Sequence, residues 1–123
     1  MKAKTRVLKI NVEEKKITEI KLNHSLDIVG EIGNDCSIFS APVYLDNGDC
    51  LYCDDEGLFH ENIGAIIKEG WSYPICGNVL VVGTDVETGE TVDAKSTIEE
   101  LTDSILFIDK KNGLLMSYFA RYN

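Results

Sequence analysis

The sequence is short of the residues on which most small metal, redox and membrane proteins depend. Its 123 residues include only 2 histidines, 4 cysteines and 2 prolines. No run of about 18 apolar residues occurs, which excludes a transmembrane helix. Residues 1–16 lack the apolar core of a signal peptide. We therefore expect a cytoplasmic protein that makes no membrane contact.

Basic residues are missing from most of the middle of the chain. The net charge is −9, and residues 22–94 hold fourteen acidic residues against one basic residue, Lys68. Residues 1–21 carry a net charge of +4, and residues 95–123 are balanced. An acidic surface repels nucleic-acid phosphates, so we expect no direct binding to DNA or RNA. The same surface attracts a basic protein, although acidity also serves plain solubility.

The pair Cys50 and Cys53 is the most suggestive metal motif in the chain. Leu51 and Tyr52 between them favour a strand, in which the two thiols point to opposite faces. A zinc knuckle holds such a pair in a tight turn, and a redox pair precedes a helix. The sequence therefore predicts no metal and no cofactor, with zinc through Cys50 and Cys53 kept as an alternative. The remaining candidate ligands form no second pair; they are Cys36, His60 and Cys76.

Motifs for catalysis are also absent. His60-Glu61 is not followed by a second histidine at metalloprotease spacing, and no serine lies in a Gly-x-Ser-x-Gly elbow. Gly77 and Gly83 bracket a predicted strand, whereas a phosphate loop opens a helix. The sequence therefore predicts a protein that is not an enzyme and has no catalytic residues.

Alternating and helical patterns divide the first half of the chain. Residues 5–12 and 16–22 alternate and predict a hairpin. A short helix is expected over 25–32, capped by Ser25. Residues 36–45 and 50–53 predict a second hairpin, turned at Asn47-Gly48. Pro42 in its first strand indicates an edge or a bulge.

The second half predicts one more short helix over 61–70 and a central strand over 77–85 that is buried on both faces. A short strand follows near 91–95. Ser96 and Glu99 form a capping box that opens a helix through Leu101. The last residues predict a terminal hairpin turned near Lys111. The expectation is one α+β domain over 1–123, mostly antiparallel sheet with two or three short helices.

Three segments in fixed order carry a family resemblance: "VYLDNGDCLYCDDEGL", then Asn62 in "LFHENIGAII", then "ICGNVLVVGTD" followed by "STIEEL". From Arg6 to about Leu101 the chain resembles the domain of unknown function 3846 family. The resemblance implies a setting in phages, plasmids and other mobile elements. It implies no mechanism, although small acidic proteins of such elements often bind host defence enzymes, as anti-CRISPR and antirestriction proteins do.

The resulting hypothesis is an acidic interaction protein that inhibits a basic, nucleic-acid-handling host protein such as a nuclease. The expected contact is a cluster of carboxylates around the second hairpin, comprising Asp46, Asp49, Asp54, Asp55, Glu56 and Glu61.

Two further points stay open. One alternative is a small-molecule or nucleotide module, with an aromatic ring for stacking and a cation for phosphate; its candidates are Tyr52, Trp71, Tyr73, Lys68, Arg6 and Arg121. The terminal aromatics Tyr118, Phe119 and Tyr122 fit either a packed strand or a partner surface, so homo-oligomerisation is also open.

Overall fold

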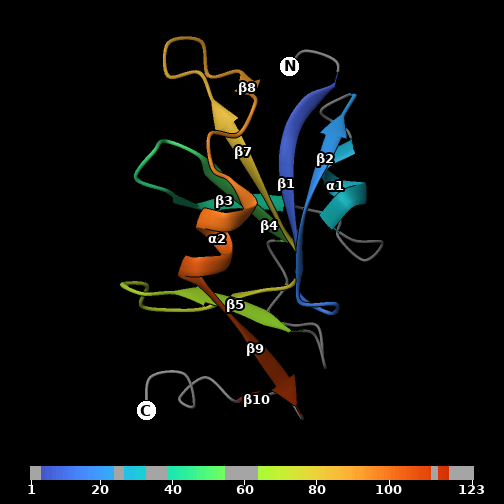
Figure 1. The fold of residues 1–123 in the computed structure, drawn as a ribbon, viewed down its shortest axis with the longest axis vertical. Helices are drawn as coiled ribbons and strands as arrows, with labels where there is room; N and C mark the ends of the chain where they lie inside the picture. Colours follow the sequence, from blue (N-terminus) through green and yellow to red (C-terminus); the bar gives the residue numbers. More distant parts are fainter. Residues whose placement is uncertain (1–3, 24–26, 33–38, 55–63, 112–113, 117–123) are drawn as a thin grey trace.

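The computed structural model describes residues 4–23, 27–32, 39–54, 64–111 and 114–116 (Figure 1). Ten strands and two short helices occur in this part of the chain. In order they are β1 (Thr5–Asn11), β2 (Lys16–Leu22), α1 (Asp27–Ile32), β3 (Phe39–Tyr44), β4 (Cys50–Asp54), β5 (Ala65–Lys68), β6 (Ile75–Cys76), β7 (Val79–Thr84), β8 (Thr91–Val92), α2 (Ile98–Ser104), β9 (Ile105–Lys111) and β10 (Leu114–Met116).

The strands form two antiparallel sheets. The larger sheet has the order β2-β1-β7-β4-β3, with β8 paired to the end of β7, and the smaller has the order β10-β9-β5-β6. The predicted α+β fold with a mostly antiparallel sheet is confirmed. β7 lies at the centre of the larger sheet, and five of its six residues are buried. The continuous apolar run that predicted a central strand is therefore correctly interpreted.

The β3–β4 hairpin behaves as its turn and proline residues predict. The turn falls at Asn47-Gly48, and Gly48 has a φ of 92°, a conformation that suits glycine. Pro42 lies in β3, an edge strand whose register shifts between Ser40 and Val43. An edge or bulge tolerates a residue that cannot donate a backbone hydrogen bond.

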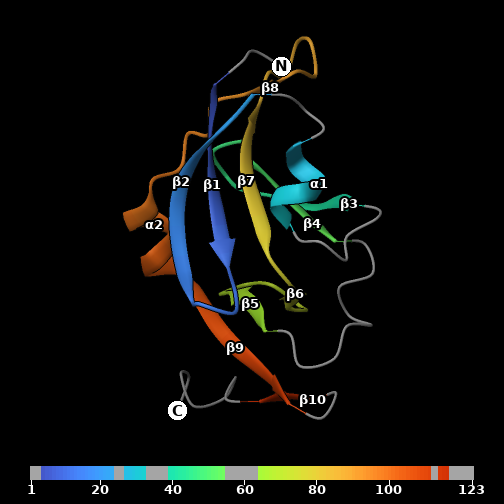
Figure 2. The same ribbon diagram turned by 90° about the vertical axis from the view of Figure 1, so that its right-hand side faces the viewer.

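The larger sheet buries apolar side chains on both of its faces. α1 covers one face, where Ile28 and Ile32 pack against Val7, Leu80 and Val82. α2 lies against the opposite face through Leu101. Figure 2 shows the two helices on opposite sides of β1 and β7. We call these the α1 face and the α2 face.

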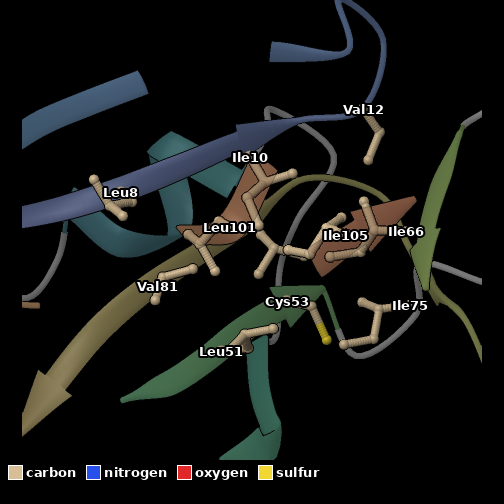
Figure 3. Close-up of a cluster of buried hydrophobic side chains, with 11 residues drawn as sticks. Leu8, Ile10, Val12, Leu51, Cys53, Ile66, Ile75, Val81, Leu101 and Ile105 are labelled. Carbon is tan, nitrogen blue, oxygen red and sulfur yellow. The ribbon is translucent and has the colours of Figure 1, made fainter. Parts of the chain in front are cut away.

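The smaller sheet contributes to the core on the α2 face. Ile66, Ile75 and Ile105 join side chains such as Ile10 and Leu51 of the larger sheet in one buried cluster (Figure 3). The second face of the smaller sheet buries a separate group, made of Ala65, Ile67, Cys76 and Ile108. The two sheets thus share a core, and α2 lies beside the place where they meet.

The predicted helix over 61–70 is wrong where the structure describes it. Residues 65–68 form β5, which pairs with β6 on one side and β9 on the other. Ile66 and Ile67 were assigned to one helical face, but they bury into different clusters on opposite faces of the strand. β-branched side chains favour such a strand, and Gly70, with a φ of 93°, turns the chain after it.

Several other predictions are confirmed at the level of elements. The N-terminal and terminal hairpins, the helix near 25–32 and the short strand near 91 are all present. Neither helix that the structure describes is long and apolar enough to cross a bilayer. Some predictions lie outside the described residues, namely those on Ser25, Cys36, His60, Tyr118, Phe119, Arg121 and Tyr122.

Candidate functional site

The segment of residues 93–97 crosses the α2 face and delivers the chain from β8 into α2. It passes so close to β7 that a Cβ atom on Gly83 would lie 2.1 Å from the carbonyl oxygen of Asp93. Any larger residue would force the crossing segment or the strand to shift, so glycine is the residue that fits at this position. Gly83 therefore fixes where the crossing segment runs, and hence where α2 begins.

Arg6 of β1 fastens the crossing segment from one side. Its guanidinium donates to the carbonyl oxygen of Ala94 at 2.8 Å and to that of Ser96 at 3.3 Å. The backbone of the same residue bonds the segment too, because Ala94 N–H donates to the Arg6 carbonyl and Arg6 N–H donates to an Asp93 carboxylate oxygen. Glu19 of β2 pairs with the guanidinium and holds it in place.

Asp49 fastens the segment from the other side. It is fully buried, and its carboxylate accepts the N–H groups of Lys95 and Ser96 at 2.9 and 2.7 Å. The Ser96 hydroxyl donates to it at 2.7 Å and in turn accepts a hydrogen bond from the Asn47 amide. A buried carboxylate is tolerated when it accepts several hydrogen bonds. This network ties the β3–β4 turn to the start of α2.

The predicted capping box is shifted by one residue. Thr97, not Ser96, is the N-cap of α2, and its hydroxyl accepts the N–H of Glu100 at 3.1 Å. Both Ser96-x-x-Glu99 and Thr97-x-x-Glu100 satisfy the capping pattern, so the sequence alone does not separate them. The network decides, because the Ser96 hydroxyl is already bonded to Asp49.

Exposed carboxylates gather around α2. They come from the β3–β4 turn, from the turn after β5, from the crossing segment and from α2 itself, where α2 contains no basic residue in its last turn. The accompanying cations are Lys95, which is exposed, and Arg6 and Lys68, which are half-buried. We call this region the acidic α2 surface; its carboxylates are Asp46, Glu69, Asp93, Glu99, Glu100 and Asp103.

Two hollows open beside α2, and Lys68 lines both of them. The larger, of about 410 Å³, lies at the junction of β5, α2 and β9 and is lined by Glu69, Asp103 and Ser104 as well as Lys68. The smaller, of about 210 Å³, lies between α2 and the β3–β4 turn, and Lys68 and Ser104 line it too. These hollows hold the one basic residue of the acidic central stretch.

Comparison with known proteins places the chain in a family. The sequence model of the family described as domain of unknown function (DUF3846) matches residues 4–106 of the 123. The chain belongs to the DUF3846 family. No curated protein and no solved structure matches it. The family assignment confirms the predicted resemblance and extends to the start of β9.

The structure divides the carboxylates that the sequence proposed for this DUF3846 protein. Asp46 is exposed in the β3–β4 turn, as a partner-binding residue requires. Asp49 is 0% exposed, so its inclusion in a contact surface is corrected: its carboxylate is used inside the fold. Asp54 ends β4. Asp55, Glu56 and Glu61 lie outside the described residues.

The cysteine prediction concerned orientation, and the structure bears it out. Cys50 packs into the cluster on the α1 face and Cys53 into the cluster on the α2 face. Two thiols on opposite faces of a strand cannot bind one ion. Within the described ranges, no group of three or more potential ligands is close enough to hold a metal.

Cys50 has a polar neighbourhood of its own on the α1 face. Burial raises the pKa of its thiol above the ordinary value of 9.0, and hydrogen bonds with the side chains of Tyr44 and Tyr52 oppose this rise. Burial likewise raises the pKa of Tyr52 above 10.0, with the neighbouring Cys50 contributing. The thiol therefore stays protonated and unreactive at neutral pH.

Sequence reasoning missed the carboxylates that gather around α2, since Glu99 and Glu100 were assigned only to a helix and Asp103 to no site. It named Lys68 as a candidate cation of a small-molecule module, but it placed this residue in a helix where the structure has the strand β5. A signal for Lys68 was present, because it is the single basic residue in a long acidic stretch. No local pattern indicates that β5 lies beside α2, since that contact depends on the pairing of β5 with β9.

Proposed function

We propose that this DUF3846 protein acts as an acidic interaction protein that binds a basic, nucleic-acid-handling host protein. Nucleases of host defence, of the CRISPR or restriction type, are the class of partner that the proposal names. Such a protein works in the cytoplasm and inhibits its partner by occupying a channel that would otherwise hold nucleic acid. The proposal concerns neither catalysis nor direct nucleic-acid binding.

The observation that carries the proposal is the acidic α2 surface. Six exposed carboxylates come from α2 and from three segments around it, and three cations accompany them, two of which are half-buried. Glu19 and Lys21 of β2, on the same face beside Arg6, add one charge of each sign. A basic channel attracts such a surface through long-range Coulomb forces, which raise the rate of association and weaken as salt is added. The surface replaces the β3–β4 hairpin as the proposed contact, with Asp46 common to both.

The helix at the centre of the acidic α2 surface is held in a fixed position. This helix is fixed by the hydrogen bonds of Asp49 and Arg6 to the crossing segment, and its Leu101 is buried beneath the surface. Rigid placement limits the entropy lost when a partner binds. The hydrogen-bonded crossing segment thus supports a role for this surface in recognition.

An affinity pull-down from a bacterial host lysate tests the proposal, with nuclease treatment to remove nucleic acid. The variant is Asp46→Lys with Glu99→Lys, two exposed positions whose side chains make no hydrogen bond or ion pair with any residue that the structure describes. We expect the native protein to retain a basic nuclease and the variant to lose most of it. Retention should also fall as salt is raised.

The matched control is Glu13→Lys with Glu14→Lys in the β1–β2 turn. It reverses the same number of charges at exposed positions in a turn that is not part of the acidic α2 surface. The control should retain the partner as the native protein does. If both double variants lose the partner equally, net charge alone explains the binding. If neither variant loses the partner, the acidic α2 surface is not the contact.

A further inference from the structure

The two hollows beside α2 share a lysine that the fold leaves unused. Lys68 is the last residue of β5, and the alternation of the strand directs it to the same side as Ile66, toward α2. It is half-buried and lines both hollows. Throughout the described part of the chain, its ammonium group has no hydrogen-bond or ion-pair partner. Three donors are therefore available to a ligand.

A structural explanation of Lys68 exists and makes a separate prediction. α2 has no basic residue in its last turn, and Ser104 at its C-terminus lines both hollows with Lys68. A cation at a helix C-terminus stabilises the helix, because it interacts favourably with the helix dipole and the last carbonyl groups. On that explanation, loss of the charge lowers the stability of the protein and affects no ligand.

The charges around Lys68 define the class of ligand. Glu69 and Asp103 line the larger hollow with it, and Glu100 lines the smaller. A simple anion would meet one cation and three carboxylates, and a simple cation would meet the unpaired ammonium of Lys68. A ligand that carries both charges satisfies both sets of groups, because each of its ends meets the opposite charge.

The size and polarity of the larger hollow agree with a small polar ligand. Its volume of about 410 Å³ falls in the range of roughly 300–1,000 Å³ typical of small-molecule sites. Four of its seven lining residues carry a charge or a hydroxyl group, and the other three are Gly70, Ile105 and Leu106. Such a wall favours a ligand that makes several hydrogen bonds over a large apolar one.

We propose that the paired hollows around Lys68 bind a small zwitterion of the amino-acid class, whose carboxylate meets Lys68 and whose ammonium group meets Asp103 and Glu69. The site shares Lys68 and three carboxylates with the acidic α2 surface, but different variants test the two proposals, since neither Asp46 nor Glu99 lines a hollow. Failure of one proposal therefore leaves the other standing.

The test is titration of the isotope-labelled full chain with a panel of the common L-amino acids, followed by NMR. Sodium acetate and methylammonium chloride serve as probes with one charge each. We expect at least one amino acid to shift the amide signals of Lys68, Glu69, Asp103 and Ser104 in a saturable way. Lys68→Met should raise its dissociation constant roughly tenfold or more, the loss typical of a charge-assisted hydrogen bond.

Two further variants complete the design. Glu69→Gln should weaken the same amino acid, because it removes an exposed carboxylate from the larger hollow. Lys21→Met, at an exposed position on β2, removes the same charge elsewhere and should leave the affinity unchanged. Binding that survives Lys68→Met, saturation by acetate alone, or no saturable shift with any amino acid would overturn the proposal.

Discussion

The two faces of the larger sheet are closed by different kinds of interaction. On the α1 face, α1 packs Ile28 and Ile32 onto the sheet, and the ion pair from Lys9 to Glu31 is partly exposed. On the α2 face, the chain crosses as a segment without regular structure, held by Asp49 and Arg6 before α2 begins. Apolar packing covers one face, whereas hydrogen bonds determine what lies on the other.

This difference matters because the two mechanisms fix position with different precision. Apolar contacts tolerate small shifts, whereas a buried carboxylate with three donors specifies both direction and distance. The acidic α2 surface and the hollows around Lys68 both lie on the α2 face, where hydrogen bonds fix the position of the chain. Substitutions that remove apolar packing or hydrogen bonds should therefore reduce the free energy of unfolding by different amounts. The expected losses can be ranked.

The largest effect is expected from Asp49→Ala. It leaves the Lys95 N–H, the Ser96 N–H and the Ser96 hydroxyl without their buried acceptor. We expect a loss of about 4 kcal/mol in the free energy of unfolding, measured by urea denaturation. Asp46→Ala, an exposed carboxylate in the same turn, is the matched control and should change stability by less than about 0.5 kcal/mol. Similar losses from both would contradict the role given to Asp49.

Gly83→Ala should follow, with a loss of about 3 kcal/mol. The new Cβ would lie 2.1 Å from the Asp93 carbonyl oxygen, so the crossing segment or β7 must move. Gly30→Ala provides the contrast on the α1 face. Among the residues that the structure describes, no atom outside the helix's own backbone lies within 4 Å of a Cβ at that position of α1, so this change should stabilise the protein by about 0.5–1 kcal/mol. Changes of opposite sign in the free energy of unfolding would show that the backbone is tightly packed at this glycine of the α2 face and open at this glycine of the α1 face.

The sequence predicted the α1 face more completely than the α2 face. The alternation of β1 and β2, the run of β7 and the spacing of the α1 residues are local patterns, and each gave its element correctly. The α2 face depends on contacts between distant segments, such as Asp49 with Ser96 and Gly83 with Asp93. Nothing near Asp49 in the sequence distinguishes it from its exposed neighbour Asp46, so both were assigned to the surface.

The error over 61–70 has the same origin. Isoleucines at 63, 66 and 67 fit a short helical face as well as they fit a strand, and a window of this length does not separate the two. Pairing with β9, about forty residues later in the chain, decides for the strand. The same error hid the candidate site, because Lys68 lines the hollows only when residues 65–68 form the strand β5.

Arg6→Met should cost about 2 kcal/mol, because it removes charge-assisted hydrogen bonds to the Ala94 and Ser96 carbonyl oxygens. The ion pair of Arg6 with Glu19 is a separate contribution, and Glu19→Gln removes it alone. That change should cost less than about 1 kcal/mol, since Glu19 is exposed. Equal losses from the two variants would mean that the guanidinium acts through Glu19 and not through the crossing segment.

Alkaline pH should weaken the α1 face. The pKa values of the Cys50 thiol and the Tyr52 hydroxyl are both raised in the fold, mainly by burial. The unfolded chain therefore loses these protons first, at about pH 9–10. Their contribution to stability is full below that range and is lost as the pH rises through the folded values. Urea midpoints between about pH 8 and pH 10.5 should fall less steeply for Tyr52→Phe than for the native protein.

The smallest effect is expected from the ion pair on the α1 face. Lys9 Nζ lies 3.3 Å from the Glu31 carboxylate, and the two side chains are 23% and 40% exposed. A pair so accessible to water contributes about 0.5 kcal/mol or less. A double-mutant cycle with Lys9→Met and Glu31→Gln measures the coupling directly. A coupling energy similar to the loss expected for Arg6→Met would show that charged groups stabilise both faces to the same extent. A coupling energy near zero would mean that apolar packing holds α1 in place.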